Sequence, residues 1–150
     1  MVRKSSMIKI TDIMNHQPIV IGCNAKLLDA IWRLAETRCS DLMVLSDDGE
    51  WLGVLSEGDI LRSLLPSFDS IQGSLIGGGD KIEINSLELE NRSVSELLIK
   101  DAFCVGPNEG VLRAAAIMAS MNIRRLPVVD SGVLLGTIGR EDLCLGLIRD

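Results

Sequence analysis

Hydrophobic and polar positions follow one order in the first third of the chain. A short apolar run at residues 19–21 precedes residues 27–35, where apolar side chains recur three and four positions apart, the spacing of one face of a helix. Apolar runs at 42–45 and 51–55 flank a turn that contains Gly49, which predicts a β-hairpin. A further helix is expected at 57–65. The pattern therefore predicts a β-α-β-β-α unit.

The same order recurs later in the chain. Residues 10–47 align with residues 94–131 at an offset of 84 without a gap, so that Gly22 meets Gly106 and Asn24 meets Asn108. When one residue is dropped in the turn at 47–49, Asp59 meets Asp142. An internal repeat of this regularity predicts two equivalent units. In the second unit, strands are expected at 103–105, 126–129 and 134–138, and helices at 111–119 and 140–148.

The repeat defines the expected organisation and fold class, which is α+β. Repeat one is predicted over 1–66, a linker over 67–92 and repeat two over 93–150. Asn24 and Asn108 are predicted to cap the first helix of each unit, because an Asn side chain accepts from free N–H groups. The linker is expected to be most mobile at 73–80, which includes three consecutive glycines. Residues 82–90 alternate apolar and polar side chains and fit either a strand or an extended tether.

Composition narrows the classes of partner. Hydrophobic residues without Gly make up 47% of the chain, and 14 glycines add about 9%, against a usual share of roughly 45–50% with Gly included. This excess predicts a deep core or an apolar surface that a second copy covers, hence a homodimer. A net charge of −6 argues against nucleic acid and membrane as partners. The four cysteines form no C-x-x-C pair, which predicts no metal site and indicates reduced thiols in a cytoplasmic protein. No apolar run reaches the length of a membrane span.

Catalytic chemistry has no clear carrier in the sequence. The single histidine, His16, lies in a polar turn, and no nucleophile motif or phosphate-binding loop motif occurs. We therefore expect a protein that is not an enzyme and that needs no catalytic cofactor.

Two segments are candidates for binding a ligand. In residues 53–59, Ser56 and Asp59 have the spacing of a capping box, and a carboxylate at a strand-to-helix edge also suits the vicinal hydroxyls of a ribose. The two roles are compatible. Arg124 and Arg125 precede an apolar strand, where they form either a solvated surface pair or forked donors for a phosphate.

These segments, in this order and twice over, resemble the signature segments of CBS-domain (cystathionine-β-synthase domain) pairs. The resemblance rests on residues 10–14, 53–59 and 123–130 and covers nearly all of the chain outside 66–92. It implies two repeats packed about a pseudo-twofold axis, with two clefts that bind adenosyl ligands: AMP, ADP, ATP or S-adenosylmethionine. The function that the resemblance implies is that of a stand-alone regulatory sensor, which acts through an unidentified protein.

The resemblance also implies site residues. In a first cleft, Asp59 holds the ribose beside Ser56 and Val54, and the adenine pocket consists of Leu97, Ala102 and Ile123. In a second cleft, Asp142 holds the ribose, with Thr137 nearby and Ile13, Pro18 and Cys39 around the base. Arg124 and Arg125 match positions that meet phosphates.

Two departures from the family pattern favour one good site over two. Gly139 replaces the hydroxyl of the second motif, and Ser40 and Asp41 stand in the first repeat where the second has its arginine pair. The alternative function is a dimerisation or interaction module that binds no nucleotide, in which Ser56 and Asp59 act only as caps.

Overall fold

The structure is a computed structural model that describes residues 8–64 and 86–149. The first repeat contains β1 (Val20–Gly22), α2 (Leu27–Thr37), β2 (Asp41–Leu45), β3 (Trp51–Ser56) and α3 (Glu57–Leu64). The second contains α6 (Val111–Met121), β4 (Arg125–Asp130), β5 (Val133–Gly139) and α7 (Arg140–Arg149). A short helix, α1 (Ile10–Ile13), comes before β1, and α5 (Ser86–Asn91) and the 3₁₀ helix η1 (Val94–Glu96) come before α6.

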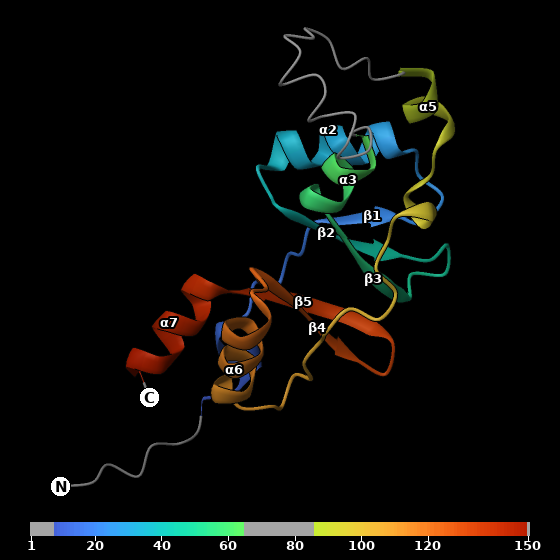
Figure 1. Ribbon diagram of the computed structural model, residues 1–150. Helices are drawn as coiled ribbons and strands as arrows, with labels where there is room; N and C mark the ends of the chain where they lie inside the picture. The colour runs from blue at the N-terminus through green and yellow to red at the C-terminus, as the bar shows by residue number, and fades with distance from the viewer. Residues whose placement is uncertain (1–7, 65–85, 150) are drawn as a thin grey trace, which may run out of the picture.

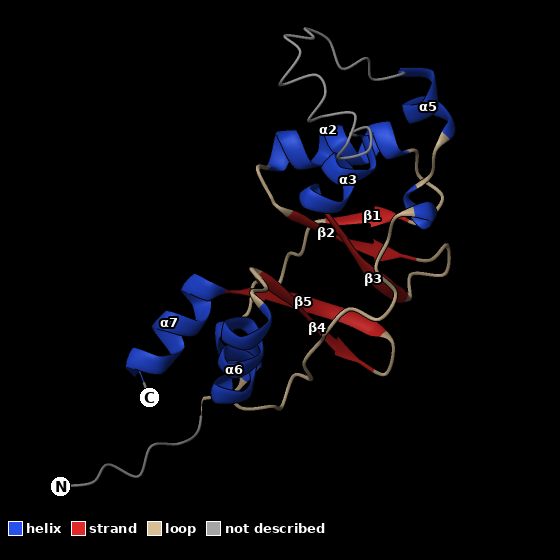
Figure 2. Ribbon diagram, in the orientation of Figure 1, coloured by secondary structure: helices blue, strands red, loops and turns tan. Residues whose placement is uncertain are grey.

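Each repeat has its helices on the outer side of a small sheet, and the two sheets lie toward the middle of the molecule (Figure 2). In the first sheet, β1 runs parallel to β2, which pairs antiparallel with β3. In the second sheet, β4 and β5 form an antiparallel pair. The α+β class and both predicted hairpins are confirmed.

The expected strand at 103–105 is reduced to a single bridge between Val105 and Val128. In the first repeat, the N–H of Met43 donates to the carbonyl of Ile19 at 3.0 Å and extends the β1–β2 ladder. The residue equivalent to Met43 is Pro127, which has no N–H to donate. The prediction of a full strand was therefore wrong, because one proline removes a ladder hydrogen bond.

Two other local predictions also need correction. Helices α2 and α6 begin after Lys26 and Gly110, and neither has a side-chain cap. Asn24 instead donates its amide to the Asp47 carboxylate at 2.9 Å, so this side chain is engaged elsewhere. The extended form expected over 82–90 is wrong for 86–90, which belong to helix α5. The stretch 73–80, predicted to be mobile, lies outside the described residues.

The segment at the start of each repeat packs into the core of the other repeat. Ile10 of α1 is fully buried in the second core, beside Val111 and Leu126. Val94 of η1 is fully buried in the first core, beside Leu27 and Leu42. Figure 1 shows the blue N-terminal segment next to α6 before it runs to β1. Residues 8–15 and 94–99, the crossing segments, thus join the two repeats.

Each crossing segment forms two backbone hydrogen bonds with the last strand of the other repeat. Ile99 and Val54 exchange bonds of 2.8 and 3.2 Å, and Asn15 and Thr137 exchange bonds of 2.8 and 3.0 Å. The equivalent glycines Gly53 and Gly136 make this approach possible. A Cβ at either position would collide with the carbonyl oxygen of Ile99 or Asn15, respectively. The two repeats are therefore related by the same contact, made twice.

Candidate functional site

A cleft of about 610 Å³ lies where the first repeat meets the second. One wall comes from β2, β3 and α3, and the other from the end of α6, the start of β4 and residues 99–103. A volume in this range suits a ligand of nucleotide size. We call this hollow the first cleft. Its lining includes charged, polar and apolar side chains: Asp41, Val54, Ser56, Glu57, Asp59, Arg62, Ile99, Asp101, Ala102, Phe103, Met121, Ile123, Arg124 and Arg125.

Asp59 lies at the strand-to-helix edge with both of its carboxylate oxygens engaged. One oxygen accepts from the Ser56 hydroxyl at 2.7 Å, and the other from Arg62 at 2.6 Å. The Ser56 hydroxyl in turn accepts from the Asp59 N–H at 3.1 Å, so that it caps helix α3. The carboxylate is 24% exposed and lines the cleft. The geometry supports the cap and leaves the carboxylate accessible to a ligand.

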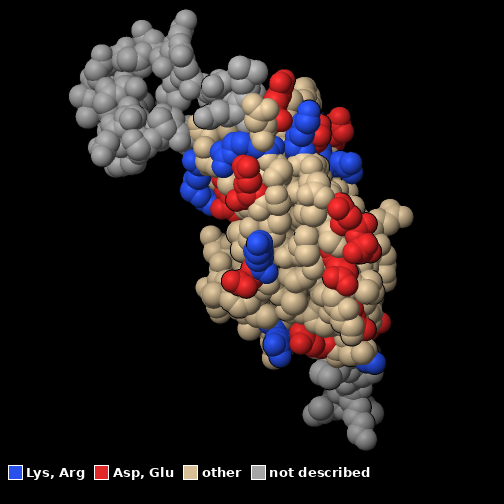
Figure 3. Space-filling view, turned by 90° about the vertical axis from the view of Figure 1, so that its right-hand side faces the viewer, with Lys and Arg blue, Asp and Glu red and all other residues tan. Residues whose placement is uncertain are grey.

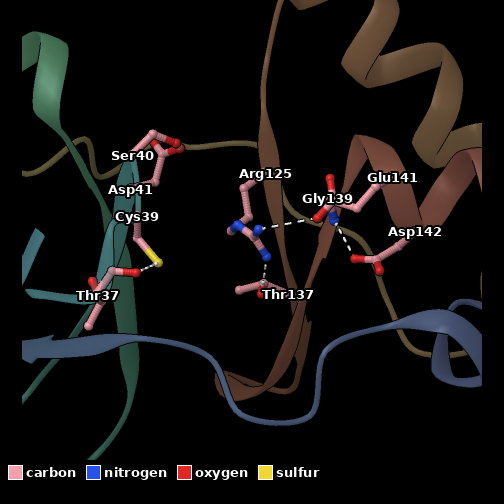
Figure 4. A network of polar contacts seen from close by, with 9 residues as sticks. All are labelled: Thr37, Cys39, Ser40, Asp41, Arg125, Thr137, Gly139, Glu141 and Asp142. Carbon is pink, nitrogen blue, oxygen red and sulfur yellow. Dashed lines mark hydrogen bonds and ion pairs between the residues drawn. The ribbon is translucent and has the colours of Figure 1, made fainter.

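Asp142 occupies the equivalent place in the second repeat with different partners. Its carboxylate accepts from the Gly139 N–H at 2.8 Å, as Figure 4 shows. Since Gly139 has no hydroxyl, the acid itself caps the first turn of α7. The second acid thus bonds the N–H of the residue before its helix, whereas the Ser56 hydroxyl bonds the N–H of the third residue of α3.

The two arginines point to different partners. Arg124 is exposed and lies 3.8 Å from the Glu57 carboxylate across the cleft. Arg125 is half-buried, donates to the Thr137 hydroxyl at 3.2 Å and lies 3.5 Å from Glu141 (Figure 4). Both guanidinium groups therefore reach the cleft while they carry acidic neighbours.

Asp41 stands at the position of the first repeat that corresponds to Arg125. Its carboxylate accepts from the Ser40 hydroxyl at 2.8 Å. Burial is the main cause that raises the pKa of Asp41 above its usual value, and the nearby charge of Glu57 adds to it. The Ser40 hydrogen bond and the two arginines act in the opposite direction. The cleft thus holds an acid whose ionised form is disfavoured.

Most residues predicted for the first cleft come together there. Val54, Ser56, Asp59, Ala102, Ile123, Arg124 and Arg125 all line it. Leu97 does not belong to this lining, because it packs against the core of the first repeat. The crossing segment turns at this point and presents Ile99 to the cleft two residues later.

The residues predicted for the second cleft differ in their burial and in the side chains that they contact. Thr137 is buried and bonded to Arg125, while Ile13 packs against the second core and lies next to Gly146 of α7. Cys39 lines a neighbouring hollow between α2 and α3, which shares Ser40, Glu57, Arg124 and Arg125 with the first cleft. Pro18 is half-buried before β1.

Sequence reasoning missed the apolar side chains at the mouth of the first cleft. Ile99, Phe103 and Met121 line it, and each is between 44% and 51% exposed. Phe103 follows the predicted Ala102 directly, and it was assigned to a buried strand. An exposed aromatic ring among polar groups is a usual platform for a base.

The described residues bear no group of three or more His, Cys, Asp or Glu side chains that could hold a metal ion. None of the helices described is long and apolar enough to cross a membrane. On the face that Figure 3 shows, acidic and basic side chains are interspersed around a largely uncharged middle. This face lacks the continuous basic surface that nucleic acid requires, as far as the described residues go.

Comparison with known proteins identifies the family. A model described as the CBS domain matches residues 10–66 and 94–148. The chain therefore belongs to the CBS-domain family and contains a tandem pair of these domains. The uncharacterized protein MJ1426 of Methanocaldococcus jannaschii is 31% identical over 153 residues, which cover 93% of this chain and 90% of the relative.

Two solved structures share the fold. CBSX2 in complex with AMP has a TM-score of 0.71 at 23% identity and covers 94% of this chain, which covers 96% of CBSX2. The CBS domain pair of MJ0100, in complex with 5′-methylthioadenosine and S-adenosyl-L-methionine, has a TM-score of 0.69 at 19% identity, with 95% and 98% of the two chains covered. At these identities the likeness shows the arrangement of two CBS repeats.

Proposed function

We propose that this protein is a regulatory sensor module that binds an adenosyl ligand in the first cleft. The observation that carries the proposal is that cleft itself, about 610 Å³ in volume, with Asp59 on one wall and Phe103, Ile123 and Arg124 on the other. Both structural relatives named above were solved with adenosyl compounds bound. A function in regulation, not in catalysis, fits a chain of two CBS repeats.

The lining suggests how the ligand lies. The Asp59 carboxylate accepts hydrogen bonds from the ribose hydroxyls once Arg62, which is 73% exposed, yields one of the oxygens. The adenine base packs between Val54 and the apolar group of Ile99, Phe103 and Ile123. Arg124 is placed to reach a phosphate, at the expense of its long contact with Glu57.

Thermal unfolding with adenosine, AMP, ADP, ATP and S-adenosylmethionine tests the proposal. A ligand at a hundred times its dissociation constant stabilises the folded state by about 2.7 kcal/mol. For a chain of this size, the melting temperature should rise by roughly 5–11 °C, at about 2–4 °C per kcal/mol. Asp59→Asn should remove most of this rise and leave the free protein folded, since Asn still accepts from Ser56.

Matched variants locate the site and its anion contact. Asp142→Asn makes the same chemical change at the other edge and should leave the rise in place. If Asp142→Asn removes it instead, the ligand occupies the second cleft. Arg124→Ala should weaken AMP, ADP and ATP more than adenosine, because the nucleoside has no phosphate to lose. If none of these compounds shifts the melting temperature, the alternative of an interaction module without nucleotide takes over.

We further propose that two copies associate through the outer helices. A neighbouring hollow of about 680 Å³ lies between α2 and α3, with Ile31, Leu61 and Leu64 on its apolar side and arginines, among them Arg124 and Arg125, at its other edge. Leu61 is 59% exposed there, and in the second repeat Leu112 and Ile148 are 74% and 79% exposed. Such exposed aliphatic side chains on the helices of both repeats suit the apolar core of a dimer interface.

Sedimentation at tens of micromolar tests the association. A dimer should sediment at twice the 16.3 kDa mass of the chain, and Leu61→Glu should shift it to the monomer. Leu145→Glu places the same charge on a less exposed position of α7 and compares the two repeats. A species of single-chain mass for the parent protein would contradict the proposal.

A further inference from the structure

The charges of the first cleft do not add up to a strong anion site. Its lining carries four acidic residues, Asp41, Glu57, Asp59 and Asp101, against three arginines, Arg62, Arg124 and Arg125. Each arginine already has an acidic neighbour: Arg62 pairs with Asp59, Arg124 with Glu57 and Arg125 with Glu141. A ligand with several phosphates would have to share these cations with the acids of the protein.

Asp41 differs from Glu57 and Asp59, which are paired with arginines, and from Asp101, which is exposed whereas Asp41 is half-buried. Among the described residues its carboxylate has a hydrogen bond from the Ser40 hydroxyl but no ion pair. Its place is fixed by the sheet, since Asp41 lies opposite Ser56 in the β2–β3 register. Ser56 holds Asp59, so the unpaired carboxylate lies on the strand adjacent to the expected ribose contact.

Asp41 also lies opposite Arg125 in the first cleft. In Figure 4, Ser40 and Asp41 lie on one side and Arg125 with its partners on the other. The repeat places these two residues at equivalent positions, at the start of β2 and of β4. Where the second repeat presents a cation to the shared cleft, the first presents an anion. The wall of the cleft from the first repeat is therefore net negative, and the opposite wall is net positive.

We propose that Asp41 is a specificity-determining residue of the first cleft, which disfavours adenosyl ligands with a di- or triphosphate tail. Ligands whose tail carries at most one phosphate, or a positive charge, are preferred. The inference rests on the function proposed above and deepens it by naming the class of ligand. Its physical basis is repulsion between like charges in a half-buried site, where solvent screens them less than at the surface.

The raised pKa of Asp41 agrees with this role. The carboxylate already lies in surroundings that disfavour its charge, and a second anion nearby would disfavour it further. A bound polyphosphate would thus require either a protonated Asp41 or a displacement of its tail toward Arg124. A sulfonium or a neutral tail has neither requirement.

Isothermal titration calorimetry at constant ionic strength tests the proposal with adenosine, AMP, ADP, ATP and S-adenosylmethionine. The parent should bind ATP no more tightly than AMP. Asp41→Asn, which removes the charge at nearly constant shape, should tighten ATP relative to adenosine by about three- to tenfold, which is about 0.7–1.4 kcal/mol. Asp41→Arg, which copies the residue of the second repeat, should tighten it further and should weaken S-adenosylmethionine.

A control variant separates a local effect from net charge. Asp29→Asn removes the same charge on the exposed face of α2, outside the lining of the cleft, and should leave the ratio of ATP to adenosine affinity at its parent value. If adenosine binds and the ratio is the same in Asp41→Asn as in the parent, the specificity role is wrong and the proposed function stands. If no adenine compound binds any of the variants, both fall.

Discussion

The two strand-to-helix edges differ although they come from equivalent residues. In the first repeat, Ser56 caps α3 and Asp59 is left to pair with Arg62 at the mouth of a cleft. In the second, Gly139 provides no hydroxyl, and Asp142 caps α7 through the Gly139 N–H. One hydroxyl therefore decides whether the acid acts as a cap or remains available to a ligand. A repeated motif thus forms different hydrogen bonds in its two copies, because one residue of the motif differs.

The contact that both halves share should give the largest effect when it is broken. Gly53→Ala and Gly136→Ala each place a Cβ against the backbone of a crossing segment. Overpacking of this kind destabilises by about 1–3 kcal/mol, which is a fall in melting temperature of about 2–12 °C at 2–4 °C per kcal/mol. Thermal unfolding measures it. Gly22→Ala, where a Cβ has open space around it, should stay within about 2 °C of the parent. Equal effects at all three positions would contradict the crossed packing.

Removal of the hydroxyl should make the first edge resemble the second. Ser56→Ala deletes the cap of α3 and should lower the free energy of unfolding by about 1 kcal/mol. Part of this loss should return because Asp59 becomes free to accept from the backbone, as Asp142 does. Urea unfolding measures the change. A loss of more than about 2 kcal/mol would show that Ser56 has a larger role than a cap.

The reverse exchange, in the second repeat, should change the free energy of unfolding by a smaller amount. Gly139→Ser adds the missing hydroxyl at the start of α7, where the nearest obstacle is the flexible Glu141 carboxylate. The new cap should raise the free energy of unfolding by about 0.5 kcal/mol. The same urea experiment measures it, and Gly139→Ala serves as the control without a hydroxyl. If Ser and Ala behave alike at this position, the hydroxyl does not cap α7.

The smallest effect should come from the acid that stands opposite Arg125. Since the folded-state pKa of Asp41 is raised, the folded protein binds more protons than the unfolded chain between the usual value of 3.8 and that raised pKa. Its contribution to stability is therefore lost as pH rises through this window. Asp41→Asn should match the parent near pH 3 and exceed its melting temperature at pH 7 by about 1 °C, for about 0.3 kcal/mol. Melting curves of both proteins from about pH 3 to pH 7 test this prediction. If the melting temperature of Asp41→Asn exceeds that of the parent most near pH 3, the pKa of Asp41 is not raised by folding.

The site could be predicted from the sequence to the extent that it depends on local order. Asp59, Ser56, Arg124 and Arg125 stand in segments whose strand and helix follow from spacing, and all four line the cleft. Leu97 could not be placed in this way, because the turn of the crossing segment decides whether residue 97 or residue 99 faces the cleft. Phe103 was missed because Pro127, a residue far along the chain, prevents its strand from forming.

The sequence by itself determined the repeat, the α+β class, both hairpins and the two acids at equivalent edges, because hydrophobic spacing and turn residues act over a few positions. Only the tertiary structure decided which core each crossing segment joins and that Asp59 lines the first cleft. It also decided that Asp41 and Arg125 would share one hollow. These outcomes depend on contacts between residues that lie about 45 to 120 positions apart, and no local pattern records the energy of such contacts.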